Sequence, residues 1–285
     1  MNISLVICTR NRAASIGKCL DRVGELHSTT DCNVVVVDNG SSDETPAVIA
    51  AFADRAPFPV IYVREERPGL STARNAGVRA SSGRIVAFTD DDCYPDPDLL
   101  DAVRRLFRED GLGYATGRVR LFDPDDFPVT INESCTPVLF PPGCYIAPGA
   151  VKGANMVFTR EALERIGGFD EDFGSGSYFP AEDCDAAARA SLAGYAGRYA
   201  PELVVWHHHG RKAADVEKLH RAYDYGRGAY HMKMLVKGRG VGPRLRGWRG
   251  LPRRVLDRPA SLYWEIAGAA GYLRVARRRN GPGNN

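Results

Sequence analysis

The sequence has no long apolar run and no pattern of paired cysteines. None of its 285 residues falls in a stretch of the roughly 18 apolar residues that a membrane-spanning helix requires. The seven cysteines are scattered, odd in number and without a CxxC pair, which argues against a disulfide framework. Residues 1–11 also lack the charged and apolar segments of a secretory leader. We therefore expect a cytoplasmic protein with free thiols.

Two phosphate-binding motifs are missing as well. The first apolar run, residues 3–8, leads into Thr9-Arg10-Asn11-Arg12 and not into GxGxxG or GxxxxGK[ST], so neither a dinucleotide-binding fold nor a P-loop is supported. No internal repeat or low-complexity segment occurs. The 44% hydrophobic and 26% charged residues are ordinary for a globular protein.

The net charge of +3 hides an asymmetry along the chain. Residues 1–204 hold 20 Lys and Arg against 30 Asp and Glu, whereas residues 205–285 hold 18 against 5. A basic tail suits nucleic acid, anionic lipid headgroups or a solvated surface. We expect no nucleic-acid partner, because the tail lacks both zinc-finger spacing and alternating aromatic and basic residues.

Apolar runs alternate with helical patterns through the first 110 residues. Strands are expected over residues 3–8, 33–37, 60–63 and 84–89, with helices over 13–26, 44–54 and 71–81 between them. The β-branched run at 33–37 is typical of a strand buried on both faces of a parallel sheet. This order predicts an α/β fold with a Rossmann-like, doubly wound, mostly parallel sheet.

The second part of the chain is less regular. Helices are expected near 97–109, 160–166 and 182–193, strands at 114–121, 151–158 and 203–206, and a loop over 123–150. Residues 211–280 have helical patterns interrupted by Gly and Pro. We expect one domain over residues 1–210, made of halves 1–110 and 111–210, followed by a basic helical extension over 211–285.

Three of the expected strands end in polar clusters, which must meet at one edge of a parallel sheet. These clusters are Thr9-Arg10-Asn11, residues 38–43 and Asp90-Asp91-Asp92. Asp90 and Asp92 can place one oxygen on a divalent ion and another on a ribose hydroxyl, and Mg²⁺ or Mn²⁺ fills its other positions with phosphate and water. Adjacent like charges repel by about 0.2–0.5 kcal/mol per pair, so an ordinary solvated turn is the less favoured reading.

Other polar residues leave two readings open. Asp38 accepts hydrogen bonds from a nucleobase, or it only begins a turn before a helix. Ser71 is a helix N-cap before Arg74 and Asn75, which suit a diphosphate or ribose. Asp183, in Glu182-Asp183, is a general base or a charge that stabilises a helix N-terminus.

Three histidines, residues 207–209, follow the last expected strand. Only His207 and His209 can share a face of an extended segment. No Cys or His partners stand at zinc-ligand spacing, so a structural zinc site is not expected. Two readings stay open: one histidine completes a metal or diphosphate site, or the three histidines form a solvated strand end.

Taken in order, these motifs resemble the family 2 glycosyltransferases, which have the GT-A fold of nucleotide-diphospho-sugar transferases. The resemblance covers about residues 3–210. The segments that carry it are residues 7–12, 36–45, 69–77, 88–92 and 167–171, and Glu182-Asp183. It makes 1–110 the nucleotide-binding half and 111–210 the acceptor half. Cys93 departs from the family pattern, because many relatives have a further acid there.

The resemblance implies an inverting, Mn²⁺- or Mg²⁺-dependent transfer of a sugar from a nucleotide-diphosphate donor, with UDP favoured, to a hydroxyl of a saccharide, lipid carrier or natural product. It implies the following roles: Thr9 and Asp38 at the base with Arg10 and Asn11 nearby, Arg74 at the diphosphate, Asp90 at the ribose, Asp92 at the metal, His207 at the metal or diphosphate, Asp183 as catalytic base and Glu182 at the acceptor or sugar.

Two other functions fit parts of the pattern. A nucleotidyltransferase shares the fold class and the metal pair, but the Gly-rich triphosphate loop that it needs is missing here. A non-catalytic sugar-nucleotide-binding protein would not need both Asp92 and Asp183.

The basic tail also leaves two readings open. Eight basic residues and one acid lie between Lys237 and Arg258 among apolar residues, which suits peripheral contact with anionic lipid at the inner face of the cell membrane. Gly and Pro residues interrupt this segment and favour a packed appendage instead. In that reading Trp248, Trp264 and Tyr272 pack on the catalytic body or on a second subunit of a homodimer.

Overall fold

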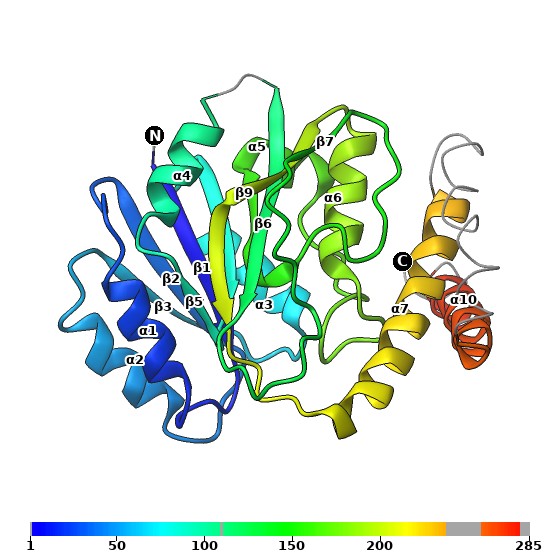
Figure 1. The fold of residues 1–285 in the computed structure, drawn as a ribbon, viewed down its shortest axis with the longest axis horizontal. Coiled ribbons are helices and arrows are strands. Elements are labelled where there is room, and N and C mark those ends of the chain that lie inside the picture. The colour runs from blue at the N-terminus through cyan, green and yellow to red at the C-terminus, as the bar shows by residue number, and fades with distance from the viewer. Residues whose placement is uncertain (1, 109–110, 238–257, 280–285) are drawn as a thin grey trace.

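A mixed sheet forms the centre of the molecule in the computed structural model, which describes residues 2–108, 111–237 and 258–279 (Figure 1). Within those residues the strand order is β3-β2-β1-β4-β8-β6-β9-β5, and β7 pairs with β9. The strands are β1 Ile3–Thr9, β2 Cys32–Asp38, β3 Val60–Arg64, β4 Ile85–Asp90, β5 Cys93–Pro95, β6 Leu112–Leu121, β7 Val138–Phe140, β8 Met156–Thr159 and β9 Ala196–His207. The helices are α1 Ile16–Gly24, α2 Thr45–Ala53, α3 Leu70–Ala80, α4 Leu99–Leu106, α5 Arg160–Ile166, α6 Glu182–Leu192, α7 Val216–Lys237 and α10 Ala260–Arg279, with 3-10 turns at Gly153–Asn155 and Ala213–Asp215.

The first four strands along the sheet, β3, β2, β1 and β4, are all parallel. The valine run of β2 is buried on both faces, as predicted: Val34 and Val36 belong to the core that contains α1 and α2, and Val35 and Val37 to the core that contains α3. Helices therefore cover both faces of this half, and the predicted α/β fold class is confirmed.

The second half of the sheet departs from a simple doubly wound pattern. Strand β8 lies between β4 and β6 and is antiparallel to both, while β6 and β9 are parallel. The expected strand over 151–158 is partly wrong, because Gly153–Asn155 form a 3-10 turn and the strand begins at Met156. The strand expected at 203–206 is much longer and begins at Ala196.

The start of α3 also differs from the expectation. Ser71 is not the N-cap, because the helix begins at Leu70 and Gly69 occupies the capping position. Gly69 has φ 126°, a conformation that side chains disfavour. The Ser71 hydroxyl is buried and has no hydrogen-bond partner within the described residues.

Helices α7 and α10 pack side by side at the edge of the domain (Figure 1). A Cβ atom at Gly228 would lie 1.9 Å from the Glu265 carbonyl oxygen, and one at Gly268 would lie 1.9 Å from the Tyr225 carbonyl oxygen. The two backbones therefore touch. Tyr272 of α10 is buried against Phe173 and Phe179, so α10 packs on the catalytic body as the second reading of the tail expected.

Most of the basic segment between Lys237 and Arg258 cannot be placed in this fold. Residues 238–257, with Trp248, lie outside the described residues. Contact with anionic lipid, homodimer formation and the proposed domain boundaries therefore stay predictions. Within residues 2–108, 111–237 and 258–279, no helix has the length and apolar character needed to cross a membrane.

Candidate active site

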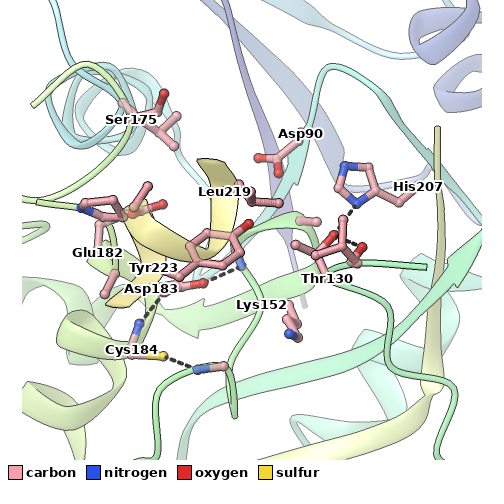
Figure 2. A pocket seen from close by; sticks show the side chains of 18 of the residues that line it. Asp90, Thr130, Lys152, Ser175, Glu182, Asp183, Cys184, His207, Leu219 and Tyr223 are labelled. Atoms are coloured by element: carbon pink, nitrogen blue, oxygen red, sulfur yellow. Dashed lines mark hydrogen bonds between the residues drawn. The ribbon is translucent and has the colours of Figure 1, made fainter. Parts of the chain in front are cut away.

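A pocket of about 650 Å³ lies at the carboxyl ends of β1 and β4, where the strand-end clusters were expected to meet (Figure 2). Six of the predicted residues line it: Arg74, Asp90, Asp92, Glu182, Asp183 and His207. The other four, Thr9, Arg10, Asn11 and Asp38, do not line it. Of the three strand-end clusters, only Asp90-Asp91-Asp92 lines this pocket, and residues 9–11 and 38–43 do not. The expected meeting of all three clusters at one cavity is therefore met only in part.

The three aspartates at the end of β4 have different partners. Asp90 lies 3.3 Å from the Arg74 guanidinium, and Asp91 accepts a 2.7 Å hydrogen bond from the Thr9 hydroxyl. Asp92 lies 3.1 Å from Nε2 of His207. Adjacent carboxylates are therefore tolerated because each faces a separate donor.

The electrostatic environment distinguishes these acids. Burial raises the pKa of Asp91 to about 6, although the Thr9 hydrogen bond opposes the shift. Burial raises the pKa of Asp90 in the same way, against the charge of Arg74. At Asp92 burial is outweighed by the hydrogen bond and charge of His207, with Arg12 and Arg211 adding to them, and the pKa is lowered. Asp92 is therefore the most readily ionised of the three.

A set of possible metal ligands converges beside Asp92. Asp90, Asp92, Cys93 and His207 each present a donor atom, and these atoms lie within 4.8 Å of one another. Burial raises the pKa of the Cys93 thiol well above its ordinary value, so the ionised donors reduce to two carboxylates, joined by an imidazole. This donor set suits Mn²⁺, and it suits Mg²⁺ less because of the imidazole. The chemistry of the residues thus fits the predicted metal.

Arg74 links the two sides of the pocket. Its guanidinium is only 2% exposed and lies 2.6 Å from Glu182 on α6 and 3.3 Å from Asp90 on β4. The resemblance placed this side chain at the diphosphate, whereas here it lies between two carboxylates. A buried cation with two acidic partners holds the start of α6 against the end of β4.

Asp183 is held by two backbone amides. Its Oδ2 accepts a 2.9 Å hydrogen bond from the Gly153 N–H, and its Oδ1 accepts one of 2.7 Å from the Cys184 N–H. Burial and the charge of Glu182 raise the pKa of Asp183 to about 6, despite these bonds. A carboxylate with a pKa near neutral, fixed at the wall of a pocket, has the properties of a general base.

The four predicted residues outside the pocket form a layer beside it. Asp38 is fully buried and accepts hydrogen bonds from the Ser41 N–H at 2.8 Å, the Tyr62 hydroxyl at 2.9 Å and the Arg64 guanidinium at 2.9 Å. Asn11, with φ 53°, accepts a 2.8 Å hydrogen bond from the Ser42 N–H. The Asn11 contact joins the loops after β1 and β2, and the Asp38 contacts join the end of β2 to β3. Base contacts by Thr9, Arg10, Asn11 and Asp38 stay predictions.

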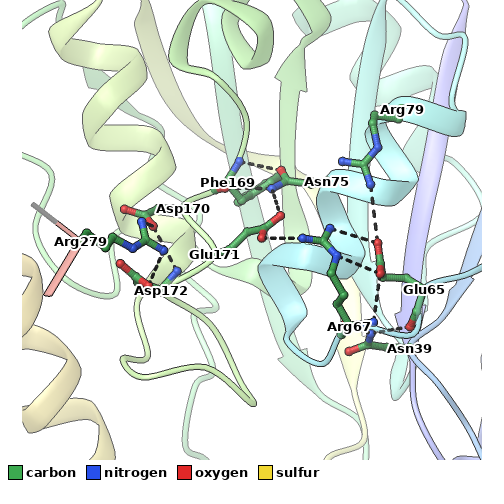
Figure 3. Close-up of polar contacts among 10 residues, drawn as sticks. All are labelled: Asn39, Glu65, Arg67, Asn75, Arg79, Phe169, Asp170, Glu171, Asp172 and Arg279. Atoms are coloured by element: carbon green, nitrogen blue, oxygen red, sulfur yellow. Dashed lines mark hydrogen bonds and ion pairs between the residues drawn. The ribbon is translucent and has the colours of Figure 1, made fainter. Parts of the chain in front are cut away.

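The glycine-rich segment after α5 is held in place by side-chain hydrogen bonds and ion pairs to residues 169–172 (Figure 3). Asn75 donates a 2.9 Å hydrogen bond to the Phe169 carbonyl oxygen and accepts one of 2.8 Å from the Phe169 N–H. Arg279 of α10 lies 2.6 Å from Asp172, and Lys233 of α7 contacts both Asp170 and Asp185. The motif residue Asn75 thus holds a loop, and the C-terminal helices stabilise the segment that leads into α6.

Sequence reasoning missed several residues that line the pocket. Lys152, Arg211 and Tyr223 were not anticipated, and Thr130 lies 3.3 Å from Nδ1 of His207. Arg211 follows His207 by four residues, a proximity that could have suggested it. Tyr223 lies within a helix and has no local feature that marks it.

Comparisons with known proteins identify the family of this chain. The glycosyl transferase family 2 model matches residues 4–167. Glycosyltransferase AglE of Haloferax volcanii is 27% identical over 206 residues, which cover 72% of this chain and 66% of that protein. For the next two curated relatives the matched part covers 41% and 18% of their length, so the chain spans less than two thirds of these relatives.

Two solved structures share the fold. The mannosyltransferase PcManGT from Pyrobaculum calidifontis, in complex with GDP-Man and Mn²⁺, aligns with TM-score 0.68 and 24% identity over 99% of this chain and 76% of its own. Residues 1–349 of S. aureus TarS, in complex with UDP-GlcNAc, align with TM-score 0.58 and 14% identity over 100% and 93%. Since the family model covers more than half of its residues, the chain belongs to glycosyl transferase family 2 and has the GT-A fold.

Proposed function

We propose that the chain is an inverting, metal-dependent glycosyltransferase that moves a sugar from a nucleotide-diphosphate donor to an acceptor hydroxyl. The observation that carries the proposal is one pocket that Asp183, with a pKa of about 6, shares with the acids at the end of β4 and with His207 at the end of β9. A base for the acceptor and a cation site for the leaving group are the two parts that such a transfer requires.

The donor side would be formed by the end of β4 and the segment after β9. Asp92 and His207, with Asp90, would hold Mn²⁺ or Mg²⁺, which when bound neutralises charge on the diphosphate. Arg211 would help bind the same diphosphate, because it lines the pocket and its side chain makes no ion pair within the described residues. The Mn²⁺ complex of PcManGT supports the choice of metal.

The chemical step follows from the position of Asp183. As the acceptor oxygen forms its bond to the anomeric carbon, the bond from that carbon to the diphosphate oxygen breaks, and the acceptor proton passes to Asp183. Glu182 would contact the acceptor or the transferred sugar while Arg74 fixes its carboxylate. A single displacement from the opposite face inverts the anomeric configuration.

The donor nucleotide is the finer part of the proposal. We favour a UDP-sugar, with Thr9 and Asp38 near the base and Arg10 and Asn11 close by. The two structural neighbours were solved with GDP-Man and UDP-GlcNAc, so a guanine donor is the first alternative.

The test is a hydrolysis and transfer panel of UDP-, GDP- and dTDP-sugars, with Mn²⁺, with Mg²⁺ and with EDTA. We expect metal-dependent release of nucleoside diphosphate, and an inverted anomer in the product by NMR. Full activity in EDTA would remove the metal from the proposal. Release of pyrophosphate from a nucleoside triphosphate and a sugar phosphate would establish a nucleotidyltransferase instead. Donor binding with no turnover would establish a binding protein.

A further inference from the structure

Helix α7 forms the wall of the pocket that faces Asp183. Leu219, His220 and Tyr223 of this helix line the cavity together with Asp183. In Figure 2 the Tyr223 ring lies beside the Asp183 side chain, and Leu219 lies further along the same wall. The donor-side acids Asp90 and Asp92 lie at and just after the end of β4, so α7 offers a separate wall, next to the base, for the acceptor.

The Tyr223 ring is available to a ligand. The side chain is 36% exposed, and its hydroxyl makes no hydrogen bond within the described residues. Burial raises its pKa, and the carboxylates of Asp183, Glu182 and Asp90 add to the shift against the opposing charge of Arg211. The phenol is therefore neutral, and the partly exposed side chain lies within the electrostatic reach of the base.

Backbone contacts fix the position of the helix that carries Tyr223. A Cβ atom at Gly226 would lie 2.3 Å from the Pro180 carbonyl oxygen, so α7 touches the chain three residues before Asp183. On its other side, α7 touches α10 at Gly228. Arg227 adds a 2.8 Å ion pair to Glu265 of α10. The backbone at Tyr223 is thus held in one place relative to Asp183, and binding needs no rearrangement of the helix.

The chemistry of this wall matches a sugar ring. A pyranose presents a face of C–H groups that stacks on an aromatic ring, and hydroxyls at its edge that need polar partners. His220 and Lys152 line the same pocket, and Lys152 makes no ion pair within the described residues. A polyprenyl chain would need a continuous apolar groove, whereas the cavity-facing residues of α7 mix apolar and polar side chains: Leu219, His220, Ala222, Tyr223 and Arg227.

We propose that the acceptor is a saccharide whose ring stacks on Tyr223 and whose reacting hydroxyl points to Asp183. This inference rests on the proposed function, since it assigns the acceptor of the same site. Tyr223 is then a residue that determines acceptor specificity and takes no part in donor binding.

The experiment compares donor hydrolysis with transfer to a defined set of acceptors. The acceptors are the methyl α- and β-glycosides of glucose, galactose, mannose and N-acetylglucosamine, with undecaprenyl phosphate in detergent as the lipid arm. The full-length protein is tested as wild type, Tyr223→Ala and Tyr223→Phe. Tyr263→Ala is the matched control, because Tyr263 is 67% exposed on α10 and does not line the pocket.

We expect transfer to at least one glycoside. Tyr223→Ala should raise the acceptor KM about tenfold, the scale of one lost aromatic contact, while donor KM and donor hydrolysis stay within about twofold. Tyr223→Phe keeps the ring and should stay within about threefold of wild type, and the control should not change. Saturation-transfer NMR with the same glycosides, free nucleoside diphosphate and Mn²⁺ should show binding that Tyr223→Ala weakens, independently of turnover.

Several results would overturn the assignment. Donor hydrolysis with neither binding of nor transfer to any glycoside rules out the saccharide, as does transfer to undecaprenyl phosphate alone. An acceptor KM that is unchanged in Tyr223→Ala would rule out the stacking role of Tyr223. An equal rise in acceptor KM and donor KM would assign Tyr223 to donor binding. If no sugar nucleotide is hydrolysed by the wild type, the proposed function itself fails and this inference fails with it.

Discussion

The wall of the pocket formed by strand ends differs from the wall formed by α7 in how its residues are spaced along the chain. Asp90 and Asp92 stand two residues apart at the end of a buried strand, and topology alone brings them to the sheet edge. Leu219 and Tyr223 lie on one helix that is placed by contacts with elements distant in the sequence, among them Pro180, α10 and, through Lys233, Asp170 and Asp185. Residues at a strand end form a local motif, whereas a docked helix contributes whichever side chains its packing turns inward.

The two walls also differ in charge. The strand-end wall contains carboxylates whose charges are balanced by Arg74 and His207. The α7 wall presents an aromatic ring, an imidazole and Arg227, whose charge is paired with Asp224 and Glu265. Burial lowers the pKa of His220, which keeps it neutral near pH 7. Chemistry that needs a cation and a leaving anion fits the first wall, and recognition of a neutral molecule fits the second.

The largest effect is expected at Asp183, where a substitution should lower turnover without changing donor binding. Asp183→Asn keeps the shape of the side chain but cannot accept a proton, so transfer should fall by about 10²–10⁴-fold while donor affinity changes little. Turnover and calorimetric titration with donor measure the two properties. Asp125→Asn, at an exposed acid, is the control. Loss of donor binding with high residual turnover would place the base elsewhere.

The next effect lies on the strand-end wall. Asp92→Asn removes a carboxylate from the proposed cation site, so transfer should fall by about 10²–10³-fold and Mn²⁺ should no longer bind in calorimetry. The circular dichroism spectrum should match that of wild type, because the side chain lies at the pocket and not in the apolar core. An undiminished enzyme would contradict the metal assignment.

A smaller effect concerns pH. With a pKa of about 6, Asp183 is active as the carboxylate, so kcat/KM should be constant above that pH and fall about tenfold for each unit below it. Asp91 also has a pKa of about 6, so the profile is repeated with Asp91→Asn. The break should persist in that variant, and its disappearance would assign the titration to Asp91.

The smallest effect concerns the glycine-rich segment between α5 and α6. Asn75→Ala removes both hydrogen bonds to Phe169 and leaves its backbone groups unpaired, so the free energy of unfolding should fall by about 1–3 kcal/mol. Urea denaturation measures this change. Asn33→Ala should cost less, because among the described residues the Asn33 amide bonds only the exposed Ser82 hydroxyl. Equal losses of unfolding free energy in the two variants would show that the hydrogen bonds between Asn75 and Phe169 stabilise the protein no more than an exposed hydrogen bond does.

The sequence predicted the strand-end wall better than the α7 wall for a physical reason. Uninterrupted β-branched runs such as that of β2 reveal a parallel sheet, and its carboxyl ends define where Asp90 and Asp92 lie. The direction of β8 could not be read in this way, because strand direction depends on neighbours that are distant in the sequence. Tyr223 could not be found for the same reason, since its role comes from the docking of α7.

Local rules failed where the backbone takes an unusual conformation. Ser71 is a favoured capping residue, yet Gly69 caps α3 because only its φ of 126° brings the preceding chain into the turn. The Arg74 contact also depended on a distant element, because its partner Glu182 lies on α6. In both cases tertiary packing decided the outcome.

The contacts at Gly226, Gly228 and Gly268 have a consequence for how the chain tolerates mutation. A Cβ atom at any of them would meet a backbone carbonyl at 1.9–2.3 Å, and a backbone atom cannot swing aside as the tip of a side chain can. In a saturation library, these three positions should therefore tolerate no other amino acid, although none of them carries a reactive group. Neighbouring exposed positions of α7, such as Arg221, should accept nearly all twenty.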